Sequence, residues 1–297
     1  MIDLLLAVAC SLAIGVIFKV AAQQGMDRLA LLTVNYAAAL LLAVGALHAA
    51  APAAMGFAPP PGLVALGVAT GALFIAGFFT LAWATEVAGL SLAVAVMRVS
   101  VVIPFLASWL IWDERPTPAQ GLGLIVAGIA FFLIARREPT APSADAAVRL
   151  SVPSPGRVVQ VLALLFLAGG LVDVSLKTFD EVYAAVAERD AFLVFVFGVA
   201  FVIGLGLVLR RGVRTGIWPP LASWLWGAGL GLANYGSAVF ILRAIRQLSG
   251  PVVFPANNVA LMIGAALLGV LFWQERLSRL NWVGIGLAAV ALVLLGL

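Results

Sequence analysis

Arg98 is the ionisable residue that lies deepest inside an apolar stretch of this sequence. The stretch 89–111 carries no other charge. If it crosses a bilayer, Arg98 lies near the middle, where a charge costs about 2.5–3.5 kcal/mol on insertion scales. A guanidinium binds a carboxylate through two parallel hydrogen bonds, so Arg98 is a candidate anchor for an anionic or zwitterionic ligand. The alternative is a structural role, paired with Glu86 or bonded to the carbonyls of a broken helix.

The matching stretch of the second half of the sequence, 250–273, carries no charge. It contains Pro255, followed by Asn257 and Asn258. Proline removes a backbone donor and blocks the carbonyl four residues earlier, so we expect this helix to kink or open there. Irregular backbone at membrane depth is tolerated beside protein or a watery cavity. The two asparagines therefore either line a cavity or repair the kink.

Two Asn-Tyr pairs also fall inside apolar stretches, Asn35-Tyr36 and Asn234-Tyr235. Amide and phenol groups need hydrogen-bond partners when they leave water. We expect all four side chains to face the interior of a helical bundle. There they serve either as ligand-binding groups or as polar contacts between helices.

Further candidates stand toward the ends of apolar stretches. Lys19 and Lys177 are close enough to a boundary to reach the interface, and Asp173 is spaced for an ion pair with Lys177. They are either interfacial anchors or a symmetric pair of cavity lysines, with Asp173 as a proton-coupling carboxylate. Glu86 is the other carboxylate candidate. Most tryptophans fit an interfacial belt, although Trp83 is a candidate pocket residue.

The composition defines the class of protein. Hydrophobic residues make up 64% and charged residues 10%, against about 45–50% and about 25% in soluble domains. An integral membrane protein follows. One Cys and one His argue against a disulfide framework and a His/Cys metal site. The net charge of +4 is scattered, so nucleic acid is not an expected partner.

Ten apolar segments are long enough to cross a bilayer as helices. Turn residues or charges separate most of them, and residues 136–156, rich in Pro, Ser, Ala and charges, are predicted to form a flexible linker. The first segment lacks the basic start of a signal peptide and is expected to remain as a spanning helix. The predicted segments are 2–20, 28–48, 62–85, 89–111, 118–135, 157–177, 190–209, 219–242, 250–273 and 278–297.

The sequence repeats itself, which predicts two five-helix repeats, 1–135 and 157–297. The offset between matching residues drifts from 158 to 161, which changes of loop length explain. A repeat that crosses the membrane five times ends on the opposite side, so its copy must be inverted, with a substrate site at the midplane between the halves. Matching pairs are Lys19 and Lys177, Gly67 and Gly227, Gly71 and Gly231, Gly89 and Gly250, and Gly123 and Gly284.

These features resemble the EamA type of the drug/metabolite transporter superfamily. Each half closes with a Trp-x-Glu-Arg turn, Trp112–Arg115 and Trp273–Arg276, before a Gly-spaced last helix. Pro104, Pro251 and Pro255, in the fourth and ninth helices, add to the likeness. The resemblance covers essentially the whole chain. It implies a secondary transporter whose central cavity is lined by the first, third, fourth, sixth, eighth and ninth helices, and it leaves the cargo open.

The orientation in the membrane has two interpretations. Arginines concentrate in the linker 136–156 and in the loop 210–214, which favours a cytoplasmic linker and both termini outside. The resemblance implies both termini in the cytoplasm.

The leading prediction is a secondary transporter for a small polar organic metabolite with an anionic group, such as an amino acid or organic acid. The alternative is a transporter or flippase of a lipid-linked or amphiphilic molecule, and an intramembrane enzyme or a non-catalytic subunit is remote. We expect no catalytic residue, cofactor or metal. The expected partners are the solute and membrane lipids, in a monomer or homodimer of the bacterial inner membrane.

Overall fold

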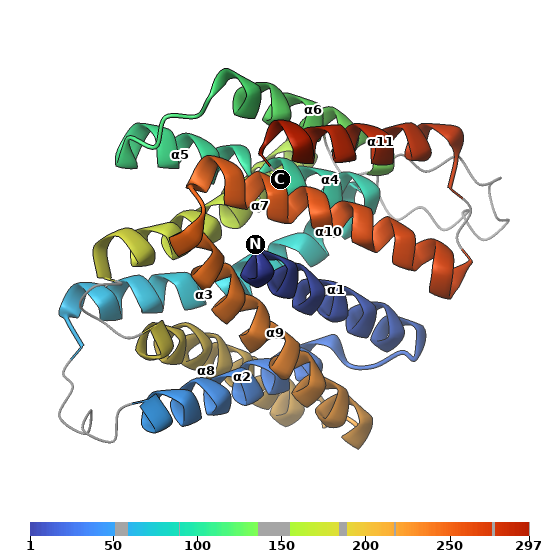
Figure 1. Ribbon diagram of the computed structural model, residues 1–297. Coiled ribbons are helices and arrows are strands. Elements are labelled where there is room, and N and C mark those ends of the chain that lie inside the picture. Colours follow the sequence, from blue (N-terminus) through green and yellow to red (C-terminus); the bar gives the residue numbers. More distant parts are fainter. Residues whose placement is uncertain are drawn as a thin grey trace, which may run out of the picture. The chain divides into compact units, whose positions relative to one another are not determined.

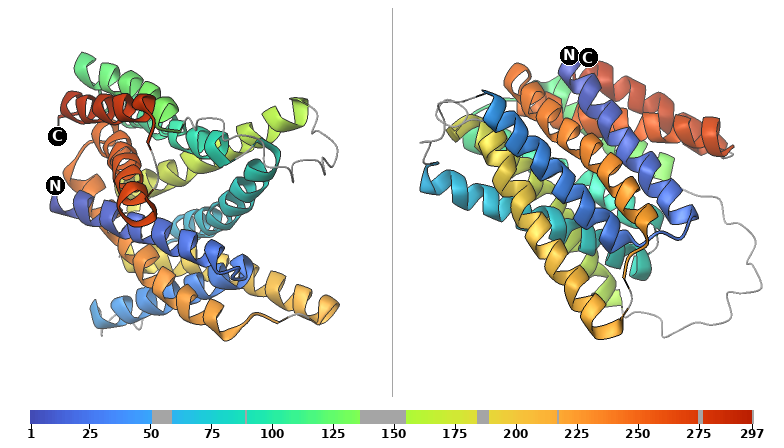
Figure 2. Two further views of the ribbon diagram at one scale, coloured as in Figure 1. Left: turned by 90° about the vertical axis from the view of Figure 1, so that its right-hand side faces the viewer. Right: turned by 90° about the horizontal axis from the view of Figure 1, so that it is seen from below.

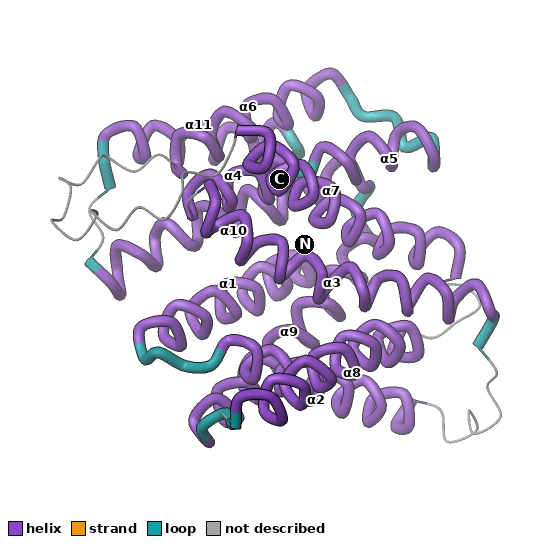
Figure 3. The backbone as a smooth tube through the Cα atoms, turned by 180° about the vertical axis from the view of Figure 1, so that it is seen from behind, coloured by secondary structure: helices purple, strands orange, loops and turns teal. Residues whose placement is uncertain are grey.

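The chain is helical throughout the part that the structure describes, and each predicted segment forms helix (Figures 1 and 3). The computed structural model describes residues 1–50, 59–88, 90–135, 155–183, 189–216, 218–274 and 277–296, and no strand occurs in them. Most of the predicted linker lies outside these residues. The helices are α1 (Ile2–Gln23), α2 (Arg28–Ala50), α3 (Pro61–Ala88), α4 (Leu90–Val99), α5 (Val102–Trp112), α6 (Pro118–Ala135), α7 (Pro155–Thr178), α8 (Arg189–Thr215), α9 (Leu221–Gln247), α10 (Gly250–Trp273) and α11 (Arg279–Leu294).

Eight helical stretches among the described residues are long and apolar enough to cross a membrane. One of them, Leu92–Trp112, combines most of α4 with α5. Two shorter apolar helices, Pro118–Ile134 and Arg279–Leu294, complete the set of ten. The described part of the chain is therefore all-α and has the helices of a multi-pass membrane protein.

The helices group into two compact units that do not follow the two halves of the sequence. One unit comprises Met1–Ile75 and Ser175–Leu248, and the other comprises Ala76–Val174 and Ser249–Leu297. In the first unit, α2 contacts both α8 and α9, and α1 packs on α9 (Figures 1 and 2). In the second, α6 lies along α11, and α10 contacts α5, α6 and α11. Each unit thus draws helices from both halves.

The matching glycines of the third helix in each half make close contacts, and these contacts join the halves. A Cβ on Gly67 of α3 would lie 2.6 Å from the Cβ of Phe195 on α8. A Cβ on Gly227 of α9 would lie 2.7 Å from the Cβ of Val34 on α2. Neither site has room for a side chain, so glycine lets the backbones approach. The third helix of each half therefore packs on the second helix of the other.

Counterpart helices also pair with one another in antiparallel fashion. A Cβ on Gly123, near the start of α6, would lie 3.1 Å from Leu294 Cβ at the end of α11. Conversely, a Cβ on Gly284, near the start of α11, would lie 3.0 Å from Leu133 Cβ near the end of α6. The same two matched glycines thus define both ends of this contact.

The turns before α6 and α11 repeat the same geometry. Asp113 and Gln274 both have left-handed backbone, with φ of 54° and 52°. Two capping boxes follow. The N–H of Thr117 donates to Gln120 Oε1 at 2.9 Å, and the N–H of Ser278 donates to Asn281 Oδ1 at 2.9 Å. These two turns thus share both their backbone geometry and their capping hydrogen bonds.

The fourth stretch is interrupted, whereas the expected opening at Pro255 does not occur. Helix α4 ends at Val99 and α5 begins at Val102, while α10 is unbroken through Pro255. Pro104 explains the interruption, because it cannot donate to the carbonyl of Ser100, which accepts from Ile103 N–H at 2.9 Å instead. The carbonyl that Pro255 blocks belongs to Pro251, the second residue of α10, so almost no helix precedes the lost bond.

The drift in the repeat offset falls partly within a helix and not only in loops. Helix α7 continues into a π-helix, Phe179–Tyr183, whereas its counterpart α1 ends at Gln23 without one. A π-helix accommodates inserted residues within a helical run. The sequence predicted Lys177 at the end of its helix, but the helical run continues beyond it to Tyr183.

Candidate functional site

The second unit brings together Arg98, Asp173, Asn257 and Asn258. Arg98 is the penultimate residue of α4, and its Nη1 donates to Asn258 Oδ1 of α10 at 3.1 Å. Asp173, on α7, is close enough for its charge to attract that of Arg98. Three helices thus contribute to one polar group inside spanning segments. The sequence predicted all four residues as candidates and did not predict that they meet.

Glycines on α7 bring this helix against the interruption between α4 and α5. A Cβ on Gly169 would lie 2.7 Å from Ser100 Oγ, and a Cβ on Gly170 would lie within 2.8 Å of Ile103 Cγ1. Ser100 Oγ is in turn held by the carbonyl of Met97 at 2.6 Å. Asp173 is one helical turn beyond these glycines. The close approach at the interruption therefore places the carboxylate near Arg98.

Asn258 has a fixed orientation. It is 8% exposed, and its Nδ2 donates to the carbonyl of Phe254 at 3.1 Å. With the amide nitrogen held by its own helix, Oδ1 is left to accept from Arg98. The phenylalanine carbonyl is not the one that Pro255 blocks, so this bond is not a repair of a kink.

Two polar atoms of the group are buried without a partner among the described residues, Arg98 Nε and Asn257 Oδ1. An unsatisfied buried donor or acceptor costs about 1–3 kcal/mol. Such atoms call for a reason, which can be strain, a catalytic or binding role, or a bound water or ion. Here the donor is on Arg98, which bonds Asn258 through Nη1, and the acceptor is on Asn257, the residue before Asn258.

Lys177 forms an ion pair with a different carboxylate from the one its spacing suggested. Its Nζ lies 2.6 Å from Glu181 Oε1, and the lysine side chain is only 2% exposed. Asp173 interacts with Arg98 instead. Glu86, suggested as a partner for Arg98, is exposed on α3. Lys19 lies in the last third of α1 and is half-buried.

The two Asn-Tyr pairs lie in the first unit. Asn234 Nδ2 donates to Asn35 Oδ1 at 3.1 Å, which joins α9 to α2, and Tyr36 is 4% exposed. Tyr235 donates to Asp190 Oδ1 at 2.9 Å. Asp190 also accepts from Arg189. Asn35, Asn234 and Tyr235 thus form polar contacts between helices, and the sequence missed Asp190.

Trp83 lies in the second unit, near the end of α3. It is 38% exposed, and the guanidinium of Arg157 lies 5.6 Å from its ring centroid. A cation over an indole face is a favourable contact. The Trp83 indole therefore lies beside α7, and the guanidinium of Arg157 covers one of its faces.

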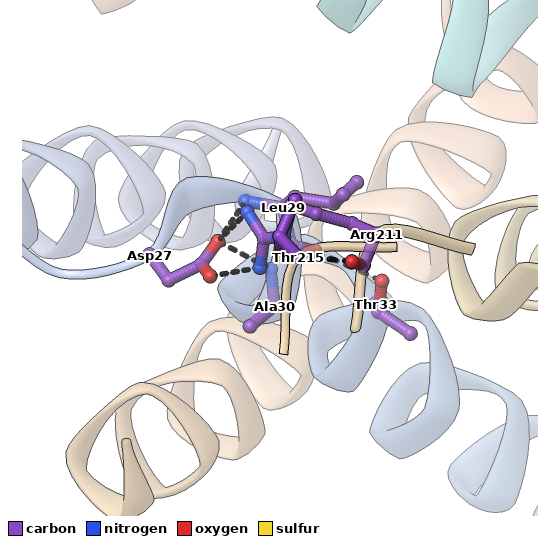
Figure 4. A network of polar contacts seen from close by, with 6 residues as sticks. All are labelled: Asp27, Leu29, Ala30, Thr33, Arg211 and Thr215. Atoms are coloured by element: carbon purple, nitrogen blue, oxygen red, sulfur yellow. Dashed lines mark hydrogen bonds and ion pairs between the residues drawn. The ribbon is translucent and has the colours of Figure 1, made fainter. Parts of the chain in front are cut away.

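A network that the sequence did not suggest joins the start of α2 to the end of α8 (Figure 4). Arg211 donates to both carboxylate oxygens of Asp27, which also accepts from the N–H groups of Leu29 and Ala30. Burial alone would raise the pKa of Asp27, but these donors hold it below its usual value. Asp27 thus caps α2 and pairs with α8 at once.

The described part of the chain contains no group of three or more His, Cys, Asp and Glu side chains that could hold a metal ion.

Comparison with known proteins supports a transporter in general terms. No protein-family model matches the sequence. A protein of Haemophilus influenzae, described as uncharacterized, is 26% identical over 95% of this chain and 93% of its own length. An uncharacterized transporter in the cobO 3'region of Sinorhizobium sp is 27% identical over 42% of this chain and 92% of its own length. A crystal structure, described only as that of a protein, shares the fold, with a TM-score of 0.73 over 99% of this chain and 98% of its own at 14% identity.

Proposed function

We propose that this chain is a secondary transporter of the EamA type in the drug/metabolite transporter superfamily. It moves a small polar organic solute with an anionic group across the membrane by alternating access. The relatives it resembles are bacterial, and we place it in the inner membrane. The multi-pass helical build and the transporter among its relatives support this class.

The pairing of counterpart helices supports two inverted repeats. Helices α6 and α11 are antiparallel, with Gly123 and Gly284 in equivalent roles. Helices that are antiparallel to their own counterparts are related by an axis across the helices, which in a bilayer lies in the membrane plane. Arg98 and Asn258, which are 160 residues apart, form a hydrogen bond to each other. Such repeats commonly serve alternating access, with the substrate between them.

Arg98 is the observation that carries the proposed substrate class. It is charged, it belongs to a spanning segment, and its Nε donor lacks a protein partner among the described residues. A guanidinium with a free donor is suited to a carboxylate, because its N–H groups match two oxygens in one plane. Asn257 and Asn258 supply amide groups beside it. The other deep candidates, Asn35, Asn234 and Tyr235, already bond to one another or to Asp190.

The test is ligand binding to the purified full-length chain. A panel of small carboxylates and amino acids is screened for a rise in melting temperature, since a ligand at 100 times its Kd stabilises by about 2.7 kcal/mol. We expect at least one hit that Arg98→Gln abolishes, with each variant compared to its own ligand-free melting temperature. Arg115→Gln, at a side chain that is 79% exposed, is the matched control and should leave the hit intact. A panel without hits, alongside stabilisation by lipid-like molecules, would instead favour the amphiphile alternative.

A further inference from the structure

We infer that the end of α8 and the start of α2 bind the phosphate headgroup of an anionic phospholipid, through Arg28, Arg210 and Arg214. All residues of this site belong to the first unit, whereas Arg98 and its partners belong to the second. The lipid is a resident of the membrane and not the transported solute. The site therefore goes beyond the proposed transport and does not depend on it.

Four arginines share a single carboxylate at this end of the unit. Asp27 accepts from Arg211 and from the N–H groups at the start of α2, so both its oxygens already have donors (Figure 4). Arg210 and Arg214 are one turn apart on α8, and Arg28 directly follows Asp27. These three residues are exposed, and none forms an ion pair with a carboxylate among the described residues. Four arginines and one carboxylate leave an excess of three positive charges.

The other end of the same unit has no such excess. Helix α8 begins there, and each of three cations has its own carboxylate within 3.0 Å among the described residues. The pairs are Lys177 with Glu181, Arg189 with Asp190 and Arg246 with Asp180. The uncompensated charge is therefore a property of one end of the unit, where α8 finishes and α2 starts.

The stability of the two helices does not explain this charge. The last turn of a helix has a partial negative charge, which accounts for Arg214 at the end of α8. The first turn has a partial positive charge, so a cation is unfavourable there. Arg28 is nevertheless the first residue of α2. An anion from outside the chain would offset this repulsion and that among the arginines.

Two tryptophans indicate that this end lies at the level of lipid headgroups. Trp218, before α9, and Trp224, in its first turn, are both exposed. Exposed indoles beside spanning helices are typical of the membrane interface. A Cβ on Gly212 would lie 2.9 Å from the ring of Trp218, so this indole rests on the turn of α8 that also carries Arg211 and Arg214. Arginines and indole thus meet at the depth where lipid phosphates lie.

The side chains around the arginines suit an amphiphile. A guanidinium binds phosphate through two parallel hydrogen bonds, and the i,i+4 spacing of Arg210 and Arg214 lets both reach one headgroup. Leu209 and Val213, the neighbours of these arginines on α8, are exposed and apolar. They provide a surface for acyl chains beside the phosphate. A soluble anion would use the arginines alone.

The experiment measures lipid binding to the purified full-length chain in a neutral detergent. Dioleoyl phosphatidylglycerol is compared with dioleoyl phosphatidylcholine, which has the same acyl chains and no net charge, and with soluble glycerol 3-phosphate. The half-saturating concentration is read from the rise in melting temperature, and native mass spectrometry detects the bound lipid. We expect phosphatidylglycerol to bind about tenfold or more tightly than phosphatidylcholine. The preference should shrink at high salt, which screens charges over a few ångströms.

Substitutions locate the site. Arg210→Gln combined with Arg214→Gln should weaken phosphatidylglycerol binding by about 25-fold, at about fivefold for each arginine, and leave phosphatidylcholine binding unchanged. Arg115→Gln combined with Arg243→Gln removes two other exposed arginines and is the matched control, which should keep the preference. If the first double variant does not fold, Arg28→Gln tests the same site from α2, with an expected loss of about fivefold.

Three results would overturn the lipid site. The first is equal binding of phosphatidylglycerol and phosphatidylcholine, and the second is an unchanged preference in the variants of Arg28, Arg210 and Arg214. The third is stabilisation by glycerol 3-phosphate at the same concentrations as phosphatidylglycerol, which would identify a soluble anion as the partner. None of these results bears on the solute, because the solute screen is read through Arg98→Gln.

Discussion

The fourth stretch of the first half, 90–112, and its counterpart α10 in the second half differ where they should be alike. Both follow the repeat and both end in the same left-handed turn, at Asp113 and Gln274. The first is interrupted between α4 and α5 and carries a charge at the interruption, while the second is continuous and carries only amides. The turns maintain the shared scaffold, and the difference between the two stretches builds the candidate site.

Both stretches contain a proline, and the position of the proline along the helix explains why only the first is interrupted. Pro104 acts in the middle of a spanning stretch, so the carbonyl that it cannot serve belongs to Ser100 at membrane depth. Pro255 removes the donor to the carbonyl of Pro251, which is the second residue of α10, so almost no helix precedes the lost bond. A proline therefore interrupts a spanning stretch when several turns of helix precede the carbonyl that it blocks, as before Ser100, and not when almost none do, as before Pro251.

Of the changes that distinguish the two stretches, the loss of Arg98 should lower the free energy of unfolding most. Arg98→Leu leaves Asp173 as a buried charge without its cation, which costs about 3–5 kcal/mol of stability. Asn258→Leu, on the continuous counterpart, removes one hydrogen-bond partner and should cost only about 1–3 kcal/mol. The free energy of unfolding in detergent measures both.

A double variant checks the cause of that loss. Combined with Asp173→Leu, Arg98→Leu should regain most of its stability, because no uncompensated charge remains. Equal losses in Arg98→Leu and Asn258→Leu, with no recovery in the double variant, would show that the charge pair is not what distinguishes the two stretches.

Replacing Pro104 or Pro255 with alanine should affect the backbone hydrogen bonds of the two stretches unequally. Pro104→Ala restores an N–H for the Ser100 carbonyl, so α4 and α5 can join and the amides near the interruption should exchange about tenfold more slowly. Pro255→Ala should change exchange in the first turns of α10 by much less. Hydrogen–deuterium exchange of peptides covering 97–106 and 250–259 tests this. A larger change in the second peptide would reverse the explanation.

Features that depend on neighbouring residues were predictable from the sequence, and features that depend on contacts between distant residues were not. Helix positions depend on local apolar runs and turn residues, so ten stretches were predicted within a few residues. The choice of helix to break was wrong, because Pro255 blocks a carbonyl at the start of its helix, whereas Pro104 blocks one in the middle of a spanning stretch. Some predicted segments were also too short, because the apolar run ends before the helix does, as at Lys177.

The partners of polar residues were the least predictable part. Asp173 was assigned to Lys177 from helical spacing, but a tertiary contact through Gly169 and Gly170 brings it to Arg98. Asp27 and Arg211 form a pair across 184 residues that no local pattern signals. Their signal was present only in hindsight: Asp27 directly precedes a helix, which is the usual place of a capping carboxylate.

Substitutions in the two capping boxes should have smaller effects on stability, and they test a second difference between the halves. Thr117→Ala and Ser278→Ala each remove one cap and should each cost about 1 kcal/mol. Asn281→Ala should cost more than Gln120→Ala, because Asn281 Nδ2 also donates to the carbonyls of Leu133 and Ile134 at 2.9 and 3.0 Å. Melting temperatures of the four variants give the comparison. Equal losses for Asn281→Ala and Gln120→Ala would mean that the bonds to α6 add nothing.

The smallest expected effect concerns the charge pair of Arg211 and Asp27, between the end of α8 and the start of α2. The pKa of Asp27 is lower in the folded protein than in the unfolded chain, so the pair stabilises fully above about pH 4 and loses this contribution as the pH falls further. Because the side chains are 33% and 15% exposed, the contribution is about 0.2–1 kcal/mol. Asp27→Asn keeps the oxygen that caps α2 and removes the charge. Melting temperatures from pH 7 to pH 3 should therefore fall less in Asp27→Asn than in the wild type, and parallel curves would show that the pair contributes no pH-dependent stability.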